Sequence, residues 1–249
     1  MCCFSGRVER VEATRIFARM TAPGRQALVY QMKVAAAAEV AMVLPLPVPP
    51  GAGEDAVRWV ALDGYVDFFA DVAKAFPVSG AIPAFGKPSY GPPAATLEVV
   101  SVGDFVASFV PSLGDFARLD PRFRMQPGTI DSVPHYADWG FAVFQLGATR
   151  GSIHEVHPMA MEFPTRHAEH LFLPTLHVHD GALHEHAVFA HVLYVQGIAA
   201  DGGWARSPTR LGQTVDVARS RGLIDGDAPV STAAIAGLHV NQDIWLPAA

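Results

Sequence analysis

The chain has 249 residues and a formal net charge of −6, with 17% charged and 50% hydrophobic residues. This composition supplies a buried core and excludes intrinsic disorder, which requires low hydrophobicity and high net charge. No cluster of Lys and Arg offers a site for nucleic acid, so we expect no nucleic-acid partner. No apolar run is long enough to cross a bilayer, and the first ten residues lack the apolar core of a signal peptide. We therefore expect a cytoplasmic protein with no membrane partner.

Strand patterns outnumber helix patterns along the chain. In order, the sequence predicts strands over residues 7–20, 26–33, 40–46, 97–110, 141–146, 156–163 and 238–245, and a β-hairpin over 173–196. Helices are predicted over 64–76, 112–119 and 213–221. Without a regular alternation of strands and helices, the fold class is α+β, β-rich, with a largely antiparallel sheet or sandwich and a few short helices. We expect a single domain over residues 1–249, with the Pro- and Gly-rich residues 78–95 as an internal boundary or a lid loop.

Histidine is concentrated in one segment, where nine of the eleven histidines lie between His154 and His191. Asp180-Gly181 is a strong signal for a two-residue hairpin turn, because the turn type that it favours requires positive φ angles. Side chains alternate along a strand, so His177 and His179 would share a face. Across the turn, His184 and His186 would then lie on that same face.

Neutral imidazoles on one face suit a transition metal such as copper or zinc. The predicted metal ligands are thus His177, His179, His184 and His186, with the soft thiolates of Cys2 and Cys3 as further candidates. The alternative is a solvated histidine face without metal, since histidine-rich composition indicates metal binding without proving it. The remaining histidines of the segment, His154, His157, His167, His170 and His191, are interpreted as structural or surface residues.

The amino terminus carries a second hypothesis. Removal of Met1 would expose Cys2 as an N-terminal thiol beside an α-amine that could act as its general base. In this respect Met1-Cys2 resembles the start of cysteine-type N-terminal nucleophile hydrolases. That resemblance implies a catalytic Cys2 assisted by Arg15 or Arg19. A structural role for Cys2 and Cys3 as small buried residues is the alternative.

A broader resemblance extends over most of the chain. The residues that carry it are the cysteine-rich start, Arg15-Ile-Phe17, Gln31, the run 41–48, Val102-Gly-Asp-Phe105, the run 136–146, His157-Pro-Met159 and Phe163-Pro-Thr165. In this order the segments resemble a bacterial family, domain of unknown function 2330. The resemblance implies an architecture and no particular activity.

Nucleotide-binding and serine-nucleophile motifs are absent from the sequence, so we expect no nucleotide cofactor. The predicted function is transition-metal binding, as a metal-dependent enzyme or as a binder, with a metal or a small molecule as the partner. The alternatives are a hydrolase or amidase that uses Cys2, and an oligomeric structural protein built as a homo-oligomer.

Overall fold

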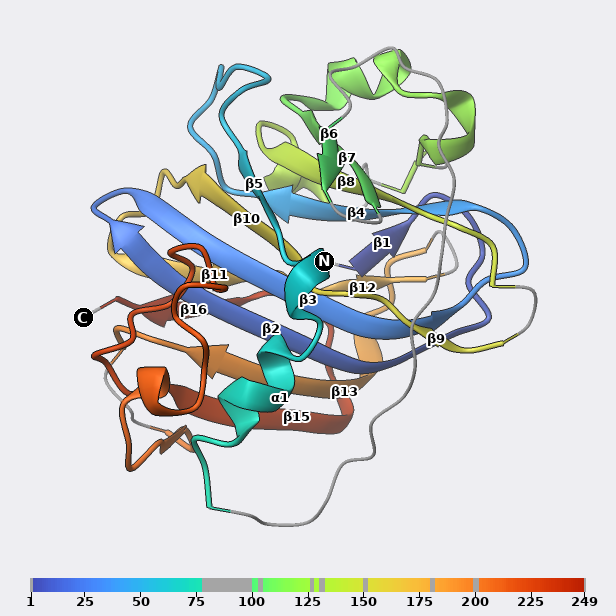
Figure 1. The fold of residues 1–249 in the computed structure, drawn as a ribbon. Helices are drawn as coiled ribbons and strands as arrows, with labels where there is room; N and C mark the ends of the chain where they lie inside the picture. Colours follow the sequence, from blue (N-terminus) through green and yellow to red (C-terminus); the bar gives the residue numbers. More distant parts are fainter. Residues whose placement is uncertain are drawn as a thin grey trace.

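The structure is a computed structural model that describes residues 2–77, 100–102, 105–125, 128–129, 133–149, 152–179, 182–198 and 202–248. Three β-sheets and a few short helices form the regular structure of these ranges (Figure 1). This architecture confirms the predicted β-rich α+β class with largely antiparallel pairing. The predicted boundary or lid at 78–95 lies outside the described residues. The described residues contain no helix with the length and hydrophobicity that a membrane span requires.

The larger sheet has eight strands, in the order β14-β15-β13-β2-β3-β10-β5, and β9 pairs with β3. Its strands are β2 (Arg10–Ala22), β3 (Arg25–Ala35), β5 (Arg58–Ala61), β9 (His154–Glu155), β10 (Met159–Pro164), β13 (His186–Val195), β14 (Ala205–Arg206) and β15 (Ser231–Val240). All neighbours are antiparallel except β13 and β2, which are parallel.

The second sheet has six strands, in the order β12-β1-β4-β8-β7-β6. Its strands are β1 (Cys2–Phe4), β4 (Val40–Leu46), β6 (Val100–Val102), β7 (Phe105–Val110), β8 (Gly140–Leu146) and β12 (His177–Val178). Only β1 and β12 are parallel. A separate antiparallel pair joins β11 (His170–Leu173) to β16 (Ile244–Pro247).

The main core lies between the two large sheets, and β4 shows why its sequence is an uninterrupted apolar run. Side chains alternate along a strand, so Met42 and Leu44 face the eight-stranded sheet. Ala41 and Val43 face the opposite way, into a separate core. All seven residues of β4 are buried because both faces of the strand are covered.

Short helices cover the outer faces of both sheets. The helix α1 (Phe68–Ala73) and η1 (Asp63–Tyr65) lie over the eight-stranded sheet, where Phe68 meets Phe17 edge-on and Phe69 contacts Tyr194 (Figure 1). η5 (Leu211–Gln213) adds Leu211 to this outer core. The six-stranded sheet is covered by η2 (Leu113–Arg118), η3 (Pro121–Phe123) and η4 (Pro134–Tyr136). The helix predicted over 64–76 is thus present but shorter, and the one predicted over 213–221 is wrong, because turns occupy that segment.

The predicted hairpin over 173–196 is also wrong. β12 belongs to the six-stranded sheet and pairs with β1, whereas β13 belongs to the eight-stranded sheet and lies between β15 and β2. The predicted turn residues, Asp180 and Gly181, lie outside the described residues. The two arms therefore face each other across the sandwich instead of forming one ladder.

Candidate functional site

The candidate site lies at the edge of the six-stranded sheet, where His177 of β12 contacts His191 of β13. β12 is only two residues long, and β1 supports one side of it, with Cys2 opposite His177 and Cys3 opposite Val178. On its other side, the side chain of Asn241 takes the place of a neighbouring strand. Its Oδ1 accepts a hydrogen bond from the His177 amide at 2.7 Å, and its Nδ2 donates to the His177 carbonyl at 2.8 Å. Both edges of this short strand are thus paired.

Asp243 fixes the approach to β12. Its Oδ1 accepts a hydrogen bond from the Leu176 amide at 2.9 Å, and its Oδ2 accepts from the Tyr136 hydroxyl. Burial raises the pKa of Tyr136, and the adjacent Asp243 carboxylate raises it further. The phenol therefore keeps its proton and donates to Asp243. Through its two hydrogen bonds, Asp243 holds the connection between β15 and β16 against the residue that precedes β12.

His177 and His191 meet at the boundary between the two sheets. Their Nε2 atoms are 3.2 Å apart, and the two side chains belong to residues that are 9% and 3% exposed. The His177 ring also stacks on Phe189 and on His179, with centroid distances of 4.5 and 4.8 Å. His179 in turn meets the ring of Phe4 edge-on. One imidazole from each sheet is therefore enclosed by aromatic rings.

Both imidazoles of this pair are neutral. Burial is the main reason that the pKa of His177 falls to about 2, and the neighbouring imidazoles of His191 and His179 contribute to this fall. Burial is also the main reason that the pKa of His191 falls to about 3. A neutral pair shares one N–H between the two Nε2 atoms, so one ring donates and the other accepts. The Nδ1 atom of His191 is buried, and no described residue forms a hydrogen bond with it.

The structure brings together only part of the predicted histidine face. His177 and His179 are adjacent, but His184 and His186 are exposed, and β13 begins at His186 opposite Val240. Because the hairpin does not form, the four imidazoles do not share a face. Among the described residues, no group of three or more His, Cys, Asp or Glu side chains is placed to hold a metal ion. Metal binding by this segment stays a prediction.

Sequence reasoning missed His191 as a site residue. It is separated from His177 by fourteen positions and by a change of sheet, so no local spacing connects the two. The only signal was the density of histidines, which includes His191 without distinguishing it from the others.

The two cysteines have different surroundings. Cys3 is fully buried in the outer core of the six-stranded sheet and forms no disulfide. The backbone of Cys2 is in register with His177. This register brings the residue predicted as an N-terminal nucleophile beside the strand that carries His177.

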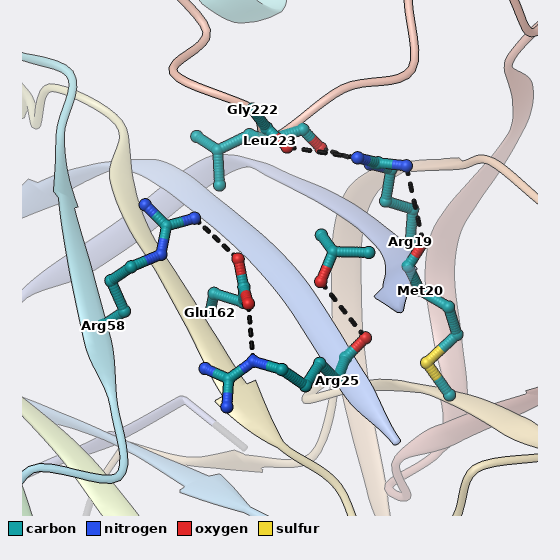
Figure 2. Close-up of polar contacts among 8 residues, drawn as sticks. Arg19, Met20, Arg25, Arg58, Glu162, Gly222 and Leu223 are labelled. Carbon is teal, nitrogen blue, oxygen red and sulfur yellow. Dashed lines mark hydrogen bonds and ion pairs between the residues drawn. The ribbon is translucent and has the colours of Figure 1, made fainter. Parts of the chain in front are cut away.

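The two arginines predicted to assist Cys2 have other partners. Arg15 donates to Gln31 Oε1 at 3.1 Å and to Glu155 Oε1 at 3.0 Å. Arg19 donates to the carbonyl oxygens of Leu223 and Gly222 at 2.9 and 3.1 Å, as Figure 2 shows. Its pKa is lowered by burial. Arg19 therefore connects β2 to the segment that contains Gly222 and Leu223.

A second polar cluster lies beside Arg19, where Glu162 sits between Arg25 and Arg58 (Figure 2). Both arginines reach its carboxylate at 2.6 Å, and the Glu162 side chain is 13% exposed. Burial alone would raise the pKa of Glu162, but the hydrogen bonds from Arg58 and Arg25 lower it below its usual value. This arrangement joins β3, β10 and β5.

The fold is similar to that of baculovirus P35. The crystal structure of baculovirus P35 matches with a TM-score of 0.52 and 13% identity, covering 99% of this chain and 99% of that one. A mutated baculovirus P35 after caspase cleavage matches with a TM-score of 0.51 and 12% identity, covering 96% of this chain and 100% of that one. No family model and no curated protein matches the chain. This similarity shows the fold alone. The resemblances to cysteine-type N-terminal nucleophile hydrolases and to domain of unknown function 2330 stay predictions.

Proposed function

We propose that this chain is a protease-directed protein, which binds a protease as a macromolecular partner and restrains its activity. The observation that carries the proposal is the full-length likeness to baculovirus P35, including a P35 that a caspase has cleaved. The match covers nearly all of both chains, so it is not limited to one sheet or one supersecondary motif. At this identity the likeness concerns architecture, and the step to function is our inference.

The geometry of the sandwich suits a protein partner. The two sheets and their covering helices form three apolar cores, which give the chain a rigid frame. A rigid frame lowers the entropic cost of binding, because fewer residues have to be ordered when the partner binds. β1 and β12 are held between β4 and the side chains of Asn241 and Asp243, so the amino-terminal strand belongs to this frame.

The test is a stoichiometric inhibition assay with a caspase and with unrelated serine and metalloproteases. The protease is preincubated with increasing amounts of the chain, and residual activity is measured on a small fluorogenic peptide. The chain is followed in parallel by intact mass spectrometry. The proposal predicts that one protease class loses activity in proportion to the added chain, which stays intact or is cut at a single position.

Two results would contradict the proposal. One is full protease activity at a large molar excess of an intact chain. The other is cleavage at many positions without loss of protease activity, which is the behaviour of an ordinary substrate. Chain unfolded by heat before the assay is the matched control, because it has the same composition without the fold.

A transition-metal function is the second candidate, favoured by the facing Nε2 atoms of His177 and His191. Two ligands of one tetrahedral zinc ion, at bond lengths of about 2.0–2.1 Å, lie roughly 3.3 Å apart. The observed 3.2 Å is close to this spacing, and neutral imidazoles are the ligating form. Metal content of untagged protein, measured by mass spectrometry, tests the candidate. A metal equivalent that is lost in His191→Ala and kept in His186→Ala supports it, and equal content in all three proteins contradicts it.

A further inference from the structure

Three arginines and one carboxylate meet on the outer face of the eight-stranded sheet (Figure 2). Arg19 lies in β2, Arg25 begins β3, Arg58 begins β5 and Glu162 lies in β10. Each stands two positions from a residue of the outer core, and side chains two positions apart along a strand share a face. These core residues are Phe17, Ala27, Val60 and Ala160. The four charged residues, called the arginine cluster below, therefore border the outer core.

The arginine cluster holds more positive charge than its carboxylate neutralises. Glu162 contacts both Arg25 and Arg58, at 2.6 Å each. Arg19 donates only to backbone carbonyl oxygens, and no carboxylate among the described residues forms an ion pair with it. Asp225 attracts Arg19 from a longer distance, and one of its oxygens already accepts a backbone amide. Three guanidiniums thus share one carboxylate in direct contact, although the net charge of the chain is −6.

Most N–H groups of Arg25 and Arg58 have no acceptor in the protein. A guanidinium carries several N–H groups in a fixed plane. Arg25 uses its Nε and Arg58 its Nη2, each on Glu162, and within the described ranges neither guanidinium donates to anything else. The two arginine side chains are 39% and 49% exposed, whereas that of Glu162 is 13% exposed. A nearly buried carboxylate therefore fixes two guanidiniums whose other donors are open to solvent.

We propose that the arginine cluster binds a phosphate group, with Arg25 and Arg58 as its hydrogen-bond donors. Guanidinium matches the geometry of phosphate oxygens and forms strong, charge-assisted hydrogen bonds with them. A phosphate dianion offsets the positive charge that Glu162 leaves on the three arginines, and Arg19 adds attraction from the neighbouring strand. Free inorganic phosphate and the phosphate of a small monoester present the same terminal oxygens, so the chemistry of recognition is shared and the experiment separates the two sources.

A purely structural network of the same residues leads to different expectations. Arg–Glu–Arg groups also occur as stabilising ion-pair networks, in which the carboxylate is the partner that both arginines need. At a phosphate site, Glu162 instead repels the bound anion and competes with it for the two guanidiniums. Glu162→Gln therefore weakens the fold in both cases, but it strengthens phosphate binding only if the site exists.

Isothermal titration calorimetry at constant ionic strength tests the site, with inorganic phosphate and phenyl phosphate as the two probes. Arg25→Gln and Arg58→Gln are each expected to raise the phosphate dissociation constant by roughly tenfold, because each removes charge-assisted hydrogen bonds. Glu162→Gln is expected to lower it. Arg118→Gln is the matched control and should leave it unchanged, because Arg118 is 45% exposed and also pairs with a glutamate at 2.6 Å, Glu54, outside the cluster.

The two probes identify the source of the phosphate. Equal or tighter binding of phenyl phosphate supports a monoester as the ligand, and binding of inorganic phosphate alone supports the free ion. The test uses only the chain and its probe, so its result is independent of the proposed protease binding.

Three outcomes would overturn the inference. One is the absence of saturable binding of either probe up to roughly 10 mM, the range of a millimolar dissociation constant. The others are binding that Arg25→Gln and Arg58→Gln both leave unchanged, and a Glu162→Gln variant that binds phosphate no more tightly than wild type. Thermal unfolding of each variant checks that the fold is kept, and the gain expected in Glu162→Gln cannot come from a damaged fold.

Discussion

The pair of His177 and His191 predicts a steep loss of stability in mild acid. Burial lowers the pKa of both imidazoles, to about 2 and about 3, whereas an unfolded chain has histidine pKa values near 6.5. The folded protein therefore leaves both rings neutral at pH values where the unfolded chain protonates them. The stabilising contribution is present above pH 6.5 and is lost as the pH falls below it.

The size of the effect follows from the proton uptake. For each histidine that stays neutral in the folded state but protonates in the unfolded chain, the unfolding free energy falls by about 2 kcal/mol as the pH is lowered from 8 to 5. For the pair, the unfolding free energy therefore falls by about 4 kcal/mol over this pH interval, which is a large part of the stability of a typical domain. Carboxylates contribute little in this interval, because their unfolded pKa values of about 3.9–4.3 lie below it. The result does not depend on the folded-state values, provided that both remain well below 5.

Urea unfolding at a series of pH values between 8 and 5, with a chelator present, measures this loss. In His191→Gln one titrating ring is removed, so the loss is expected to fall from about 4 to about 2 kcal/mol. His186→Gln is the matched control, because His186 is exposed, and it should keep the full loss. A wild-type chain that loses less than about 1 kcal/mol, or a His191→Gln slope equal to that of wild type, would show that the folded pair accepts protons.

Three further predictions concern the frame around the site. Glu162→Gln, which removes the ion pairs with Arg25 and Arg58, should lower the unfolding free energy by about 1–2 kcal/mol in urea, and an unchanged midpoint would refute a stabilising role. A Cβ on Gly140 would lie 2.5 Å from ring carbons of Phe109, so Gly140→Ala should cost about 1–3 kcal/mol, whereas Gly64→Ala, with no atom within 4 Å, should not. In a Cys2→Ser variant, the buried Cys3 thiol should react with iodoacetamide only after unfolding in urea, and rapid native labelling would contradict its burial.

Local patterns in the sequence predicted the strands that form the centre of the fold. β4 begins and ends where its apolar run does, and β8 differs from its prediction by one residue. These strands are buried on both faces, so hydrophobicity alone marks their ends. α1 is shorter than its helical pattern because the first turn of that pattern forms η1 instead.

The hairpin prediction failed because pairing across the fold outweighed a local turn signal. Asp180-Gly181 favours a turn, but it does not decide which strands lie beside the two arms. β12 pairs with β1, where Cys2 and its partner His177 are 175 positions apart, and β13 pairs with β2 in parallel. No spacing within the histidine segment encodes these partners.

The consequence for the site is a change in its chemistry. On an exposed hairpin, histidines would titrate near their usual pKa and would be open to ions. As built, one histidine comes from each sheet, so the contact between His177 and His191 is a contact between the two layers of the sandwich. A proton added to either imidazole would place a positive charge between the two layers, and neither ring could supply a counter-ion. We therefore expect acid to separate the layers first at this edge of the six-stranded sheet, where β12 is held by only two residues of strand and by the side chains of Asn241 and Asp243.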